Sequence, residues 1–537
     1  MVTPAADADR PPNRPGAVVP VPLADVVAWA GGELTGTADV AVTGVCLDSR
    51  RVLPGDLYAA LPGATVHGAR FVPQAAAAGA VAVLTDPDGL PAARDAGLPV
   101  VVVAEPRRVL GAVAAGVYGR PAAALRTIGV TGTQGKTTVT RLLDAGLAGA
   151  GVRSAVIGTV GTRIAGRDVK TALTTPEAPD LHGLFAAMRE QDVTACAMEV
   201  SSHALVLGRV DGVVFDVAVF LNLGRDHLDF HSDVEDYYRA KASLFTPERA
   251  RLGLVDVDDE HGRRLVAEAQ AHGAGGGIPI RTLSARGSEA DWRAVDIETG
   301  PDGSTFAVLT PDGRRLPAGV PLAGDFNVAN ALAAIAAAEE AGFDGAAVAA
   351  GIAAGPGVPG RLERVPAPAD GPDPGFTVVV DYAHKPDAVA AVLRTLRPVT
   401  AGRLSIVIGA GGDRDTGKRP LMGEIAATTA DLVIVTDDNP RSEDPALIRA
   451  AMLAGARPAA ATSGAEVLEV AGRQRAIEVA IERAEAGDVV VVAGKGHETG
   501  QEIAGVVHPF DDREVVAALL AQRVAGAPGS STGEADR

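Results

Sequence analysis

The sequence predicts an α/β protein of three domains, in which mostly parallel sheets are covered by helices. Two observations predict this fold class. Short apolar runs rich in Val, Ile and Leu, which are typical of buried strands, alternate with helical patterns along most of the 537 residues. The chain is also too long for one hydrophobic core, because a domain usually holds about 100–200 residues.

The first domain is predicted from short strands that follow a polar segment. "MVTPAADADRPPNRPG" is rich in Pro, Ala and charge without periodicity, so residues 1–20 are expected to be a disordered tail. Residues 21–123 contain the strand-like runs "VTGVCLDSR", "DLYAAL", "AVAVLTD" and "PVVVVAE", separated by helical patterns. They predict a small N-terminal α/β domain.

The central domain is predicted for residues 124–357. The strand "RTIGVTG" leads into a helix from 136 to about 150, and the strands "TACAMEVS", "DVAVFLNL" and "RLGLVDV" follow, with a helix at about 233–245. This alternation favours a mostly parallel sheet covered on both faces. A segment with strand and turn signals then leads to the Ala-rich helix "NVANALAAIAAAEEAG", which ends the domain.

The last domain is predicted for residues 358–523. It follows "GPGVPG", which is typical of a linker. The strands "FTVVVDYA", "RLSIVIGA", "DLVIVTDD" and "DVVVVAG" then alternate with helices, which predicts a second parallel sheet and a Rossmann-like C-terminal domain. Residues 524–537 are expected to be another disordered tail.

Composition excludes several classes of function. The chain has 49 basic and 67 acidic residues, a net charge of −18, whereas nonspecific binding to nucleic acid or to an acidic membrane needs a basic surface. Cys46 and Cys196 cannot build a disulfide framework. No export signal or apolar run of about 18 residues is found. We therefore expect a cytoplasmic protein without membrane insertion, in a monomeric state.

A glycine-rich loop, "GVTGTQGKTT", joins the first strand of the central domain to the following helix. In such a loop, backbone N–H groups and the helix N-terminus hold phosphate oxygens, Lys136 reaches the terminal phosphates, and the Thr137 hydroxyl binds Mg²⁺. Gly132 and Gly135 are three residues apart, so the loop is one residue tighter than the common form. The alternative, a flexible turn without a ligand, leaves Lys-Thr-Thr at a helix start unexplained.

Two further polar residues follow strands of the same sheet. Glu199 ends one predicted strand and His227 follows the next, so both are expected at the edge that carries the glycine-rich loop. A carboxylate and an imidazole there suit Mg²⁺, although His is an unusual magnesium ligand. Lys241 lies inside a predicted helix, and from composition alone it would be a solvated lysine on the helix surface.

The tight loop T-G-T-x-G-K-T-T resembles that of the Mur ligase family, ATP-dependent enzymes that form amide bonds in peptidoglycan precursor synthesis. With the motifs described below, the resemblance covers about residues 40–515. It implies that Val130, where the common loop has glycine, belongs to a variant loop, and that the central domain is like that of P-loop ATPases, with ATP as co-substrate. The residues that it implies in ATP binding are Gly132, Thr133, Gly135, Lys136, Thr137, Thr138 and Asn327.

The resemblance also implies a catalytic and metal-binding set. In this family the lysine at the position of Lys241 is carbamylated by CO₂ to N6-carboxylysine, which turns a cation into an anion beside the metals and phosphates. The implied catalytic residues are Lys136, Glu199, His227 and Lys241. Thr137 and Glu199 would hold one Mg²⁺ ion, and His227 and carbamylated Lys241 would hold the other.

Four loops of the last domain contain Gly, Asp, Arg and His directly after predicted strands: "VVVDYAHKPDAV", "GAGGDRDTGKRPLMG", "VTDDNPRSEDP" and "VVAGKGHETGQ". Such loops meet at one edge of a parallel sheet. Within the family, "DDNPR" resembles the motif of members that add meso-diaminopimelate rather than L-lysine. Arg441, with Arg414, would bind the distal carboxylate, and Glu498 would accept from the distal ammonium. The implied diaminopimelate-binding residues are Arg414, Asp438, Asn439, Pro440, Arg441, Gly494 and Glu498.

The resemblance also implies the residues that bind a UDP-sugar peptide, and it makes the N-terminal domain the UDP-binding one. Those for the uridine end are Asp48, Ser49 and Arg50. Those for the muramoyl and peptide part are Thr174, Thr175, Ser201, Arg209 and His384. Leu207 is a departure, because some relatives have glutamine there, and this puts one polar substrate contact in doubt.

The implied reaction joins meso-2,6-diaminopimelate to the D-glutamate of UDP-N-acetylmuramoyl-L-alanyl-D-glutamate through an acyl phosphate. The implied partners are therefore these two substrates and ATP, with Mg²⁺ as cofactor and no nucleic acid. Other readings stay open. One is a ligase for L-lysine or for a whole peptide in cell-wall recycling. Another is a nucleotide-dependent switch that joins nothing, in which the Arg441 cluster has no role. Folylpolyglutamate synthesis shares the loop and the general fold but does not explain "DDNPR" with "GKGHE".

Overall fold

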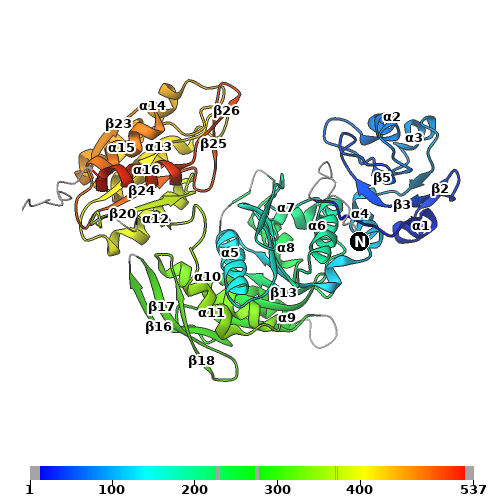
Figure 1. Cartoon of the computed structure of the whole chain (residues 1–537), viewed down its shortest axis with the longest axis horizontal. Coiled ribbons are helices and arrows are strands. Elements are labelled where there is room, and N and C mark those ends of the chain that lie inside the picture. The colour runs from blue at the N-terminus through cyan, green and yellow to red at the C-terminus, as the bar shows by residue number, and fades with distance from the viewer. Residues whose placement is uncertain are drawn as a thin grey trace, which may run out of the picture. The chain divides into compact units, whose positions relative to one another are not determined.

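The computed structural model describes residues 13–224, 226–227, 230–271, 277–300, 302–368, 371 and 373–525. It confirms the predicted α/β class with mostly parallel sheets (Figure 1). The chain divides into two compact units. The first comprises Met1–Val295, Ala307–Ala318 and Ala329–Gly355, and the second comprises Asp296–Phe306, Gly319–Val328 and Pro356–Arg537.

The N-terminal part of the first unit contains a five-stranded sheet of order β2-β7-β6-β5-β4, parallel except for β2. Alternation along its strands buries side chains on both faces. Leu57 packs in a core with α1 and α4, and its neighbour Tyr58 packs with α2 and α3. The elements are α1 Leu23–Ala30, β2 Glu33–Thr35, β4 Gly44–Cys46, β5 Asp56–Ala59, α2 Val72–Ala77, β6 Ala82–Thr85, α3 Leu90–Asp95, β7 Val100–Val102 and α4 Pro106–Val117.

The segment before this sheet is held by specific contacts. We expected a disordered tail up to residue 20, but the part of it that the structure describes contradicts this. Asn13 is buried and donates to Asp180, and the N–H groups of Gly16 and Ala17 donate to the Glu190 carboxylate. The physical reason is that two acidic side chains of the central domain supply acceptors to this polar segment, which composition alone does not reveal.

The central sheet has eleven strands in the order β11-β10-β9-β12-β8-β13-β14-β15-β16-β17-β18. Strands β9, β12, β8, β13, β14, β15 and β16 run parallel, and β10 is antiparallel to both of its neighbours, β9 and β11. The strands are β8 Arg126–Thr131, β9 Ser154–Gly158, β10 Gly161–Ile164, β11 Arg167–Val169, β12 Ala195–Glu199, β13 Phe215–Phe220, β14 Ala250–Asp256, β15 Ile280–Ser284, β16 Trp292–Gly300, β17 Gly303–Leu309 and β18 Arg315–Val320.

Strand β8 lies between β12 and β13, and the three strands end level with one another. Glu199 pairs with Val130, and Phe220 pairs with Thr131. The loops that follow these strands therefore leave the sheet at the same edge, as expected for a parallel α/β sheet. The helices of this region are α5 Lys136–Gly149, α6 Ala178–Glu190, α7 Ser202–Val206, α8 Val234–Ala242, α9 Glu260–Ala271, α10 Asp325–Glu340 and α11 Gly345–Ala353.

The second unit contains a six-stranded sheet of order β19-β20-β24-β21-β22-β23, parallel except for β19. One face is covered by α12, α13 and α14, and the other by α15 and α16 (Figure 1). The elements are β19 Glu363–Arg364, β20 Thr377–Asp381, α12 Pro386–Leu396, β21 Leu404–Ile408, α13 Lys418–Thr429, β22 Leu432–Val435, α14 Pro445–Ser463, β23 Glu466–Glu469, α15 Arg473–Glu482, β24 Val489–Ala493, β25 Gly500–Ile503, β26 Val506–Pro509 and α16 Asp512–Ala525.

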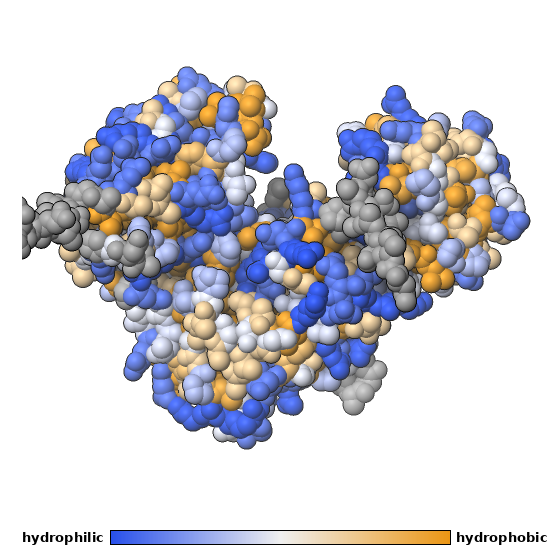
Figure 2. All heavy atoms as spheres, viewed as in Figure 1, coloured by the Kyte–Doolittle hydropathy of each residue, from blue (hydrophilic) through white to orange (hydrophobic). Residues whose placement is uncertain are grey.

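The β25–β26 hairpin of this unit presents apolar side chains to solvent. Ile503, Val506 and Val507 are 41%, 56% and 67% exposed, and Figure 2 shows apolar spheres at the place of the hairpin. The hairpin also pairs with the "DDNPR" loop, because Arg441 donates its N–H to Glu502 and accepts from the N–H of Ala504. Among the helices of the described residues, none is long and apolar enough to cross a membrane.

Candidate active site

The glycine-rich loop lies between β8 and α5, as the sequence predicts. Gly135, directly before α5, has φ +86°, a backbone conformation that favours glycine. A Cβ atom at this position would lie 2.5 Å from Oδ1 of Asn330. The tight backbone is thus compatible with glycine alone, and it leaves the first N–H groups of α5 directed at the loop.

Two lysines meet at one carbonyl of this loop. Nζ of Lys136 donates to the carbonyl oxygens of Gly132 and Thr133 at 2.7 and 3.1 Å, and Nζ of Lys241 donates to the Gly132 oxygen at 2.8 Å. Lys241 is 1% exposed and lies over the ring of Tyr237 at 4.6 Å. The interpretation of Lys241 as a solvated lysine is therefore wrong.

Burial determines the protonation of Lys241. Removal from water, and then the nearby charge of Lys136, hold the pKa of the Lys241 amine well below its usual range. Its helix, α8, is fixed locally, since the Asp233 carboxylate accepts from the N–H of Asp236 at the first turn. The structure thus presents a buried lysine whose neutral amine is favoured, at the Gly132 carbonyl of the loop.

Glu199 ends β12 beside the first turn of α5. Its carboxylate accepts from the Thr137 hydroxyl at 2.9 Å, and from the N–H and the hydroxyl of Thr159 at 2.8 and 3.1 Å. Glu199 is 1% exposed. The neighbouring Thr138 is also buried. Thr137 and Glu199, which the family resemblance assigns to one metal, thus lie in direct contact, and both offer oxygen ligands of the kind that Mg²⁺ prefers.

His227 lies beside the rings of Tyr237 and His203. It has φ +55°, its Nε2 lies 3.6 Å from a carboxylate oxygen of Asp226, and its ring centroid lies 6.1 Å from that of Tyr237 and 4.9 Å from that of His203. Within the described residues, no group of three or more His, Cys, Asp or Glu side chains is arranged to hold a metal. The unmodified Lys241 amine is no ligand for Mg²⁺, so the second predicted metal position fits only a carbamylated Lys241.

The predicted contacts to the peptide part of the substrate gather around the end of β12. The Thr175 hydroxyl donates to the Glu199 carbonyl at 2.8 Å and accepts from the Ser201 N–H at 3.2 Å. The Thr174 hydroxyl lies 3.2 Å from that of Thr159. Arg209 donates to Glu177 at 2.9 Å. The first unit therefore brings Thr174, Thr175, Ser201 and Arg209 to the edge that holds the loop.

The predicted uridine-binding residues lie in the loop after β4. Arg50 forms a two-pronged contact with the Asp48 carboxylate, at 2.9 and 2.7 Å, and this hydrogen bonding lowers the pKa of Asp48. Ser49 is buried and donates to Gln74 at 2.9 Å. Asp48 and Ser49 thus shape the loop, while Arg50 is largely exposed.

Two predicted residues belong to the second unit. Asn327 is buried, and its amide donates to the Ala323 carbonyl at 2.8 Å. His384 lies after β20, with Nδ1 2.7 Å from the Tyr382 carbonyl and its own carbonyl accepting from Lys418. Burial lowers the pKa of His384.

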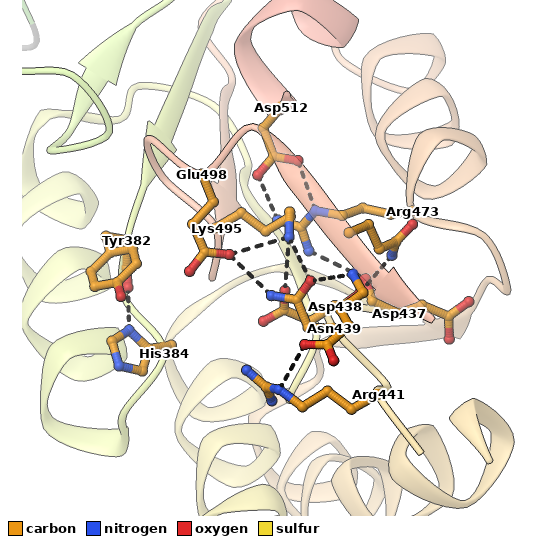
Figure 3. Close-up of polar contacts among 12 residues, drawn as sticks. Tyr382, His384, Asp437, Asp438, Asn439, Arg441, Arg473, Lys495, Glu498 and Asp512 are labelled. Carbon is orange, nitrogen blue, oxygen red and sulfur yellow. Dashed lines mark hydrogen bonds and ion pairs between the residues drawn. The ribbon is translucent and has the colours of Figure 1, made fainter. Parts of the chain in front are cut away.

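The second unit gathers most of the predicted diaminopimelate-binding residues at the ends of its parallel strands (Figure 3). Arg441 has φ +51°. Its guanidinium donates to the Gly412 carbonyl at 2.7 Å and lies 3.3 Å from the Glu502 carboxylate. Nδ2 of Asn439 donates to Oε2 of Glu498 at 3.0 Å. Adjacent loops thus present a cationic side chain, Arg441, and an anionic side chain, Glu498, at the same edge of the sheet.

Close backbone approach explains the small residues here. Gly494 has φ +117°, and a Cβ atom on it would lie 3.3 Å from the Asp438 carboxylate. A Cβ atom on Gly412 would lie 1.9 Å from the Pro440 carbonyl oxygen, so the two loops touch. Arg414 lies exposed in the loop after β21.

Three residues that hold these sites were missed by the sequence reasoning. Asn222, two residues after the end of β13, fixes the glycine-rich loop, since its side chain accepts from the Gln134 N–H at 2.9 Å. Lys495 and Arg473 are fully buried beneath the Asp438–Asn439 loop. Their positions near a strand end or at a helix start were visible in the sequence, but their contacts and the burial of Lys495 and Arg473 were not.

Family comparison adds independent support to this geometry. Residues 41–118 match the Mur ligase family, catalytic domain; residues 130–338 match the Mur ligase middle domain; and residues 360–496 match the Mur ligase, glutamate ligase domain. A Streptomyces avermitilis protein named UDP-N-acetylmuramoyl-L-alanyl-D-glutamate--2,6-diaminopimelate ligase is 57% identical over 95% of this chain and 98% of its own length. The chain belongs to the Mur ligase family.

Other Mur ligases are similar to this chain over nearly its whole length. A Streptomyces coelicolor protein of the same name is 56% identical over 94% of this chain and 97% of its own length. A solved structure of a UDP-N-acetylmuramoyl-L-alanyl-D-glutamate--2,6-diaminopimelate ligase is 36% identical, covers 94% of this chain and 99% of that one, and superposes with a TM-score of 0.67. The three family domains agree with the three-domain Mur ligase architecture expected from the sequence.

Proposed function

We propose that this Mur ligase uses ATP to join meso-2,6-diaminopimelate to the D-glutamate of UDP-N-acetylmuramoyl-L-alanyl-D-glutamate, in peptidoglycan precursor synthesis. The relatives at 57% and 56% identity, which match nearly the whole chain, have the name of this ligase. The observation that carries the proposal is the cluster of Asn439, Arg441 and Glu498, which offers opposite charges to the two charged groups at the distal end of diaminopimelate.

Activation of the carboxylate is the reason for a nucleotide loop. A carboxylate is a poor electrophile, so the γ-phosphoryl group of ATP is transferred to its oxygen, and ADP leaves. The amine of diaminopimelate then attacks the acyl carbon, inorganic phosphate leaves, and the nitrogen loses a proton. Lys136 and the first N–H groups of α5 offset the repulsion between carboxylate and triphosphate, so catalysis is mainly positioning and charge stabilisation.

The donor set beside Lys136 suits magnesium. Thr137 and Glu199, in contact at 2.9 Å and buried, would hold one Mg²⁺, and His227 with a carbamylated Lys241 would hold a second. When bound, the ions supply positive charge to the phosphate oxygens. Thr159 keeps the Glu199 carboxylate in place through two hydrogen bonds.

Carbamylation of Lys241 is consistent with its surroundings. The nitrogen lone pair of a neutral amine attacks CO₂, and loss of one proton leaves a carbamate anion. Burial and the charge of Lys136 favour this neutral amine. A carbamate there would place a negative charge next to Lys136, which is electrostatically favourable.

Selectivity for diaminopimelate over L-lysine follows from Arg441. Diaminopimelate has a distal carboxylate that a guanidinium binds bidentately. L-Lysine lacks this carboxylate and would leave the guanidinium without that partner, at a cost of about 1–3 kcal/mol. Glu498 would accept from the distal ammonium, which both amino acids have, so Arg441 provides the discrimination.

The other substrate would be bound by residues of the first unit and by His384. Asp48, Ser49 and Arg50 would meet its uridine end, and the hydroxyl groups of Thr174, Thr175 and Ser201, with Arg209, would meet the muramoyl and peptide part. Arg209 is paired with Glu177 at 2.9 Å. Substrate would therefore share or replace this ion pair.

A coupled assay tests the proposal. Purified protein is incubated with ATP, UDP-N-acetylmuramoyl-L-alanyl-D-glutamate and meso-diaminopimelate, and both phosphate and tripeptide product are measured. We expect equal amounts of both, and phosphate release that requires all three substrates. ATP consumption without tripeptide would overturn the ligase assignment, and phosphate release without either co-substrate would favour a nucleotide-dependent switch. A parallel reaction with L-lysine decides the amino acid.

A further inference from the structure

A buried lysine lies beneath the predicted amino-acid site. Lys495 follows β24 in the motif "GKGHE", and its side chain is 0% exposed. Its ammonium donates to Oδ1 of Asn439 at 3.0 Å and to Oε2 of Glu498 at 3.3 Å, and lies 3.6 Å from Oδ1 of Asp438. Figure 3 shows Lys495 in the middle of these three side chains. Burying an ammonium is costly unless it is paired, so these contacts are what keep it there.

Asn439 joins Lys495 to Glu498. Its Oδ1 accepts from Lys495 and also from the backbone N–H of Glu502 at 3.0 Å, while its Nδ2 donates to Oε2 of Glu498 at 3.0 Å. The amide orientation is thus fixed from both ends. Asn439 and Lys495 therefore act together on the same carboxylate oxygen.

The two oxygens of Glu498 are consequently unequal. Oε2 accepts from both Lys495 and Asn439. No hydrogen bond from the described residues reaches Oε1, and Figure 3 shows this oxygen on the side of the carboxylate away from Lys495. The Glu498 side chain is 35% exposed, so Oε1 is available to a ligand.

The local charge favours a cationic ligand. One lysine faces two carboxylates, Asp438 and Glu498, and Oδ1 of Asp438 is buried without a hydrogen bond. Two guanidinium groups of this site are already paired, since Arg473 contacts Asp512 twice at 2.7 Å and Arg441 contacts Glu502 at 3.3 Å. A negative charge remains at Glu498 that the ammonium of a diamino acid would balance.

We propose that Lys495 is a positioning residue for the amino-acid substrate. Together with Asn439 it holds Oε2 of Glu498, so that Oε1 faces the distal ammonium of diaminopimelate. The inference rests on the proposed function and deepens it, because it names the residue that orients the ammonium-binding carboxylate. Lys495 does not touch substrate and acts through Glu498.

Steady-state kinetics of Lys495→Met test this role. Met keeps the length of the side chain but removes the ammonium. We expect KM for diaminopimelate to rise about 10–100-fold, as for the loss of other supports of a ligand-binding side chain, with kcat and the KM values for ATP and the UDP-sugar peptide within about twofold. Arg475→Met is the matched control, since Arg475 is an exposed cation of the same unit whose ion pairs are with Glu478 and Glu482.

A double-mutant cycle separates positioning from a merely structural role. If Lys495 acts through Glu498, Glu498→Gln alone and Glu498→Gln with Lys495→Met will have the same KM for diaminopimelate within about twofold. If the two substitutions raise KM for diaminopimelate by factors that multiply in the double variant, the proposal is overturned. An unchanged KM in Lys495→Met would overturn it as well. Thermal unfolding checks the fold of each variant. If Lys495→Met does not fold, Lys495→Gln, which has a shorter side chain and no charge, must still raise KM for diaminopimelate, and an unchanged KM in that variant would overturn the proposal.

Wild-type protein keeps the two proposals distinguishable. Tripeptide formation by wild type, combined with an unaltered KM in the lysine variants, removes only the role of Lys495. If wild type forms no tripeptide from diaminopimelate, the proposed function fails and the inference fails with it.

Discussion

At the scale of single residues, the chemistry depends on side chains whose state is set by burial. Lys241 is the clearest case, because a lysine with 1% exposure at the Gly132 carbonyl is held towards its neutral form. Arg441 is the second, because its position with φ +51° directs its guanidinium to the Gly412 carbonyl and to Glu502. Each gives a prediction that one substitution can test.

Replacement of Lys241 by Ala removes the site of the proposed carbamate. We expect kcat to fall about 10²-fold or more, as when other groups that stabilise transition-state charge are removed, and a short carboxylic acid to restore part of it by supplying the lost anion. Turnover is measured with and without added formate or acetate. Lys170→Ala, at an exposed lysine of the same unit, is the control. Full activity of Lys241→Ala would show that no carbamate is needed.

Replacement of Arg441 by Ala removes the predicted partner of the distal carboxylate. A loss of about 1–3 kcal/mol predicts a 5- to 150-fold rise in KM for diaminopimelate, with KM for ATP unchanged. Arg441→Lys is expected to lie between, because an ammonium cannot form the bidentate contact. KM values for diaminopimelate and L-lysine are measured for all three proteins. Equal preference of wild type and Arg441→Ala for the two amino acids would contradict the assigned role.

At the scale of elements, helix α6 is tied to the loop before β13 by the buried histidine His182. His182 is fully buried, and its Nε2 lies 3.0 Å from the Asp211 carbonyl. Burial lowers the pKa of His182 to about 4. Because Nδ1 is buried without a hydrogen bond, the neutral ring with its proton on Nε2 fits this position.

This histidine predicts a pH dependence of stability. In the unfolded chain the imidazole has its ordinary pKa of about 6.5, so below that pH the unfolded state binds a proton that the folded state does not. The contribution of His182 to the free energy of unfolding is therefore complete above about pH 6.5, and it falls by about 3 kcal/mol as the pH approaches 4. His182→Gln should flatten this part of the curve of unfolding free energy against pH. The exposed His508→Gln is the control, and an equally steep curve for His182→Gln would refute the prediction.

At the scale of the whole molecule, the chain consists of two compact units, and residues 13–17 reach across the first of them. Arg14 forms a two-pronged contact with the Asp56 carboxylate, at 3.1 and 2.7 Å, and donates to the Tyr118 hydroxyl. The side chains of Arg14 and Asp56 are only 7% and 3% exposed. Asn13, Gly16 and Ala17 bond to α6 of the central region.

Removal of this buried cation predicts a large loss of stability. Arg14→Met leaves the Asp56 carboxylate buried without its partner, and breaking such a pair costs about 3–5 kcal/mol. Urea unfolding followed by fluorescence should show the unfolding transition of the first unit at a lower urea concentration than in wild type. Arg475→Met, which breaks only exposed ion pairs, should leave it in place. A normal transition in Arg14→Met would mean that the segment contributes nothing to the stability of this unit.

The sequence by itself determined the fold class, the position of the glycine-rich loop and the strand ends at which the functional residues lie. Strand and loop patterns are local, so "RTIGVTG" followed by "TQGKTT" predicts a strand, a turn and a helix without knowledge of the rest of the chain. In the second unit the same reasoning placed "DDNPR" and "GKGHE" at one edge, which the aligned ends of β20, β24, β21 and β22 confirm.

Only the tertiary structure decided which side chains are buried and which oxygen each cation meets. The contact of Lys241 with the Gly132 carbonyl spans 109 positions of the sequence. The contact of Arg14 with Asp56 spans 42 positions, and that of Lys495 with Glu498 spans 3. Burial depends on what the rest of the chain packs around a residue, and a local pattern does not contain that information. For this reason the sequence predicted disorder for residues 13–17 and gave no role to Lys495, because their contacts and burial depend on other parts of the chain.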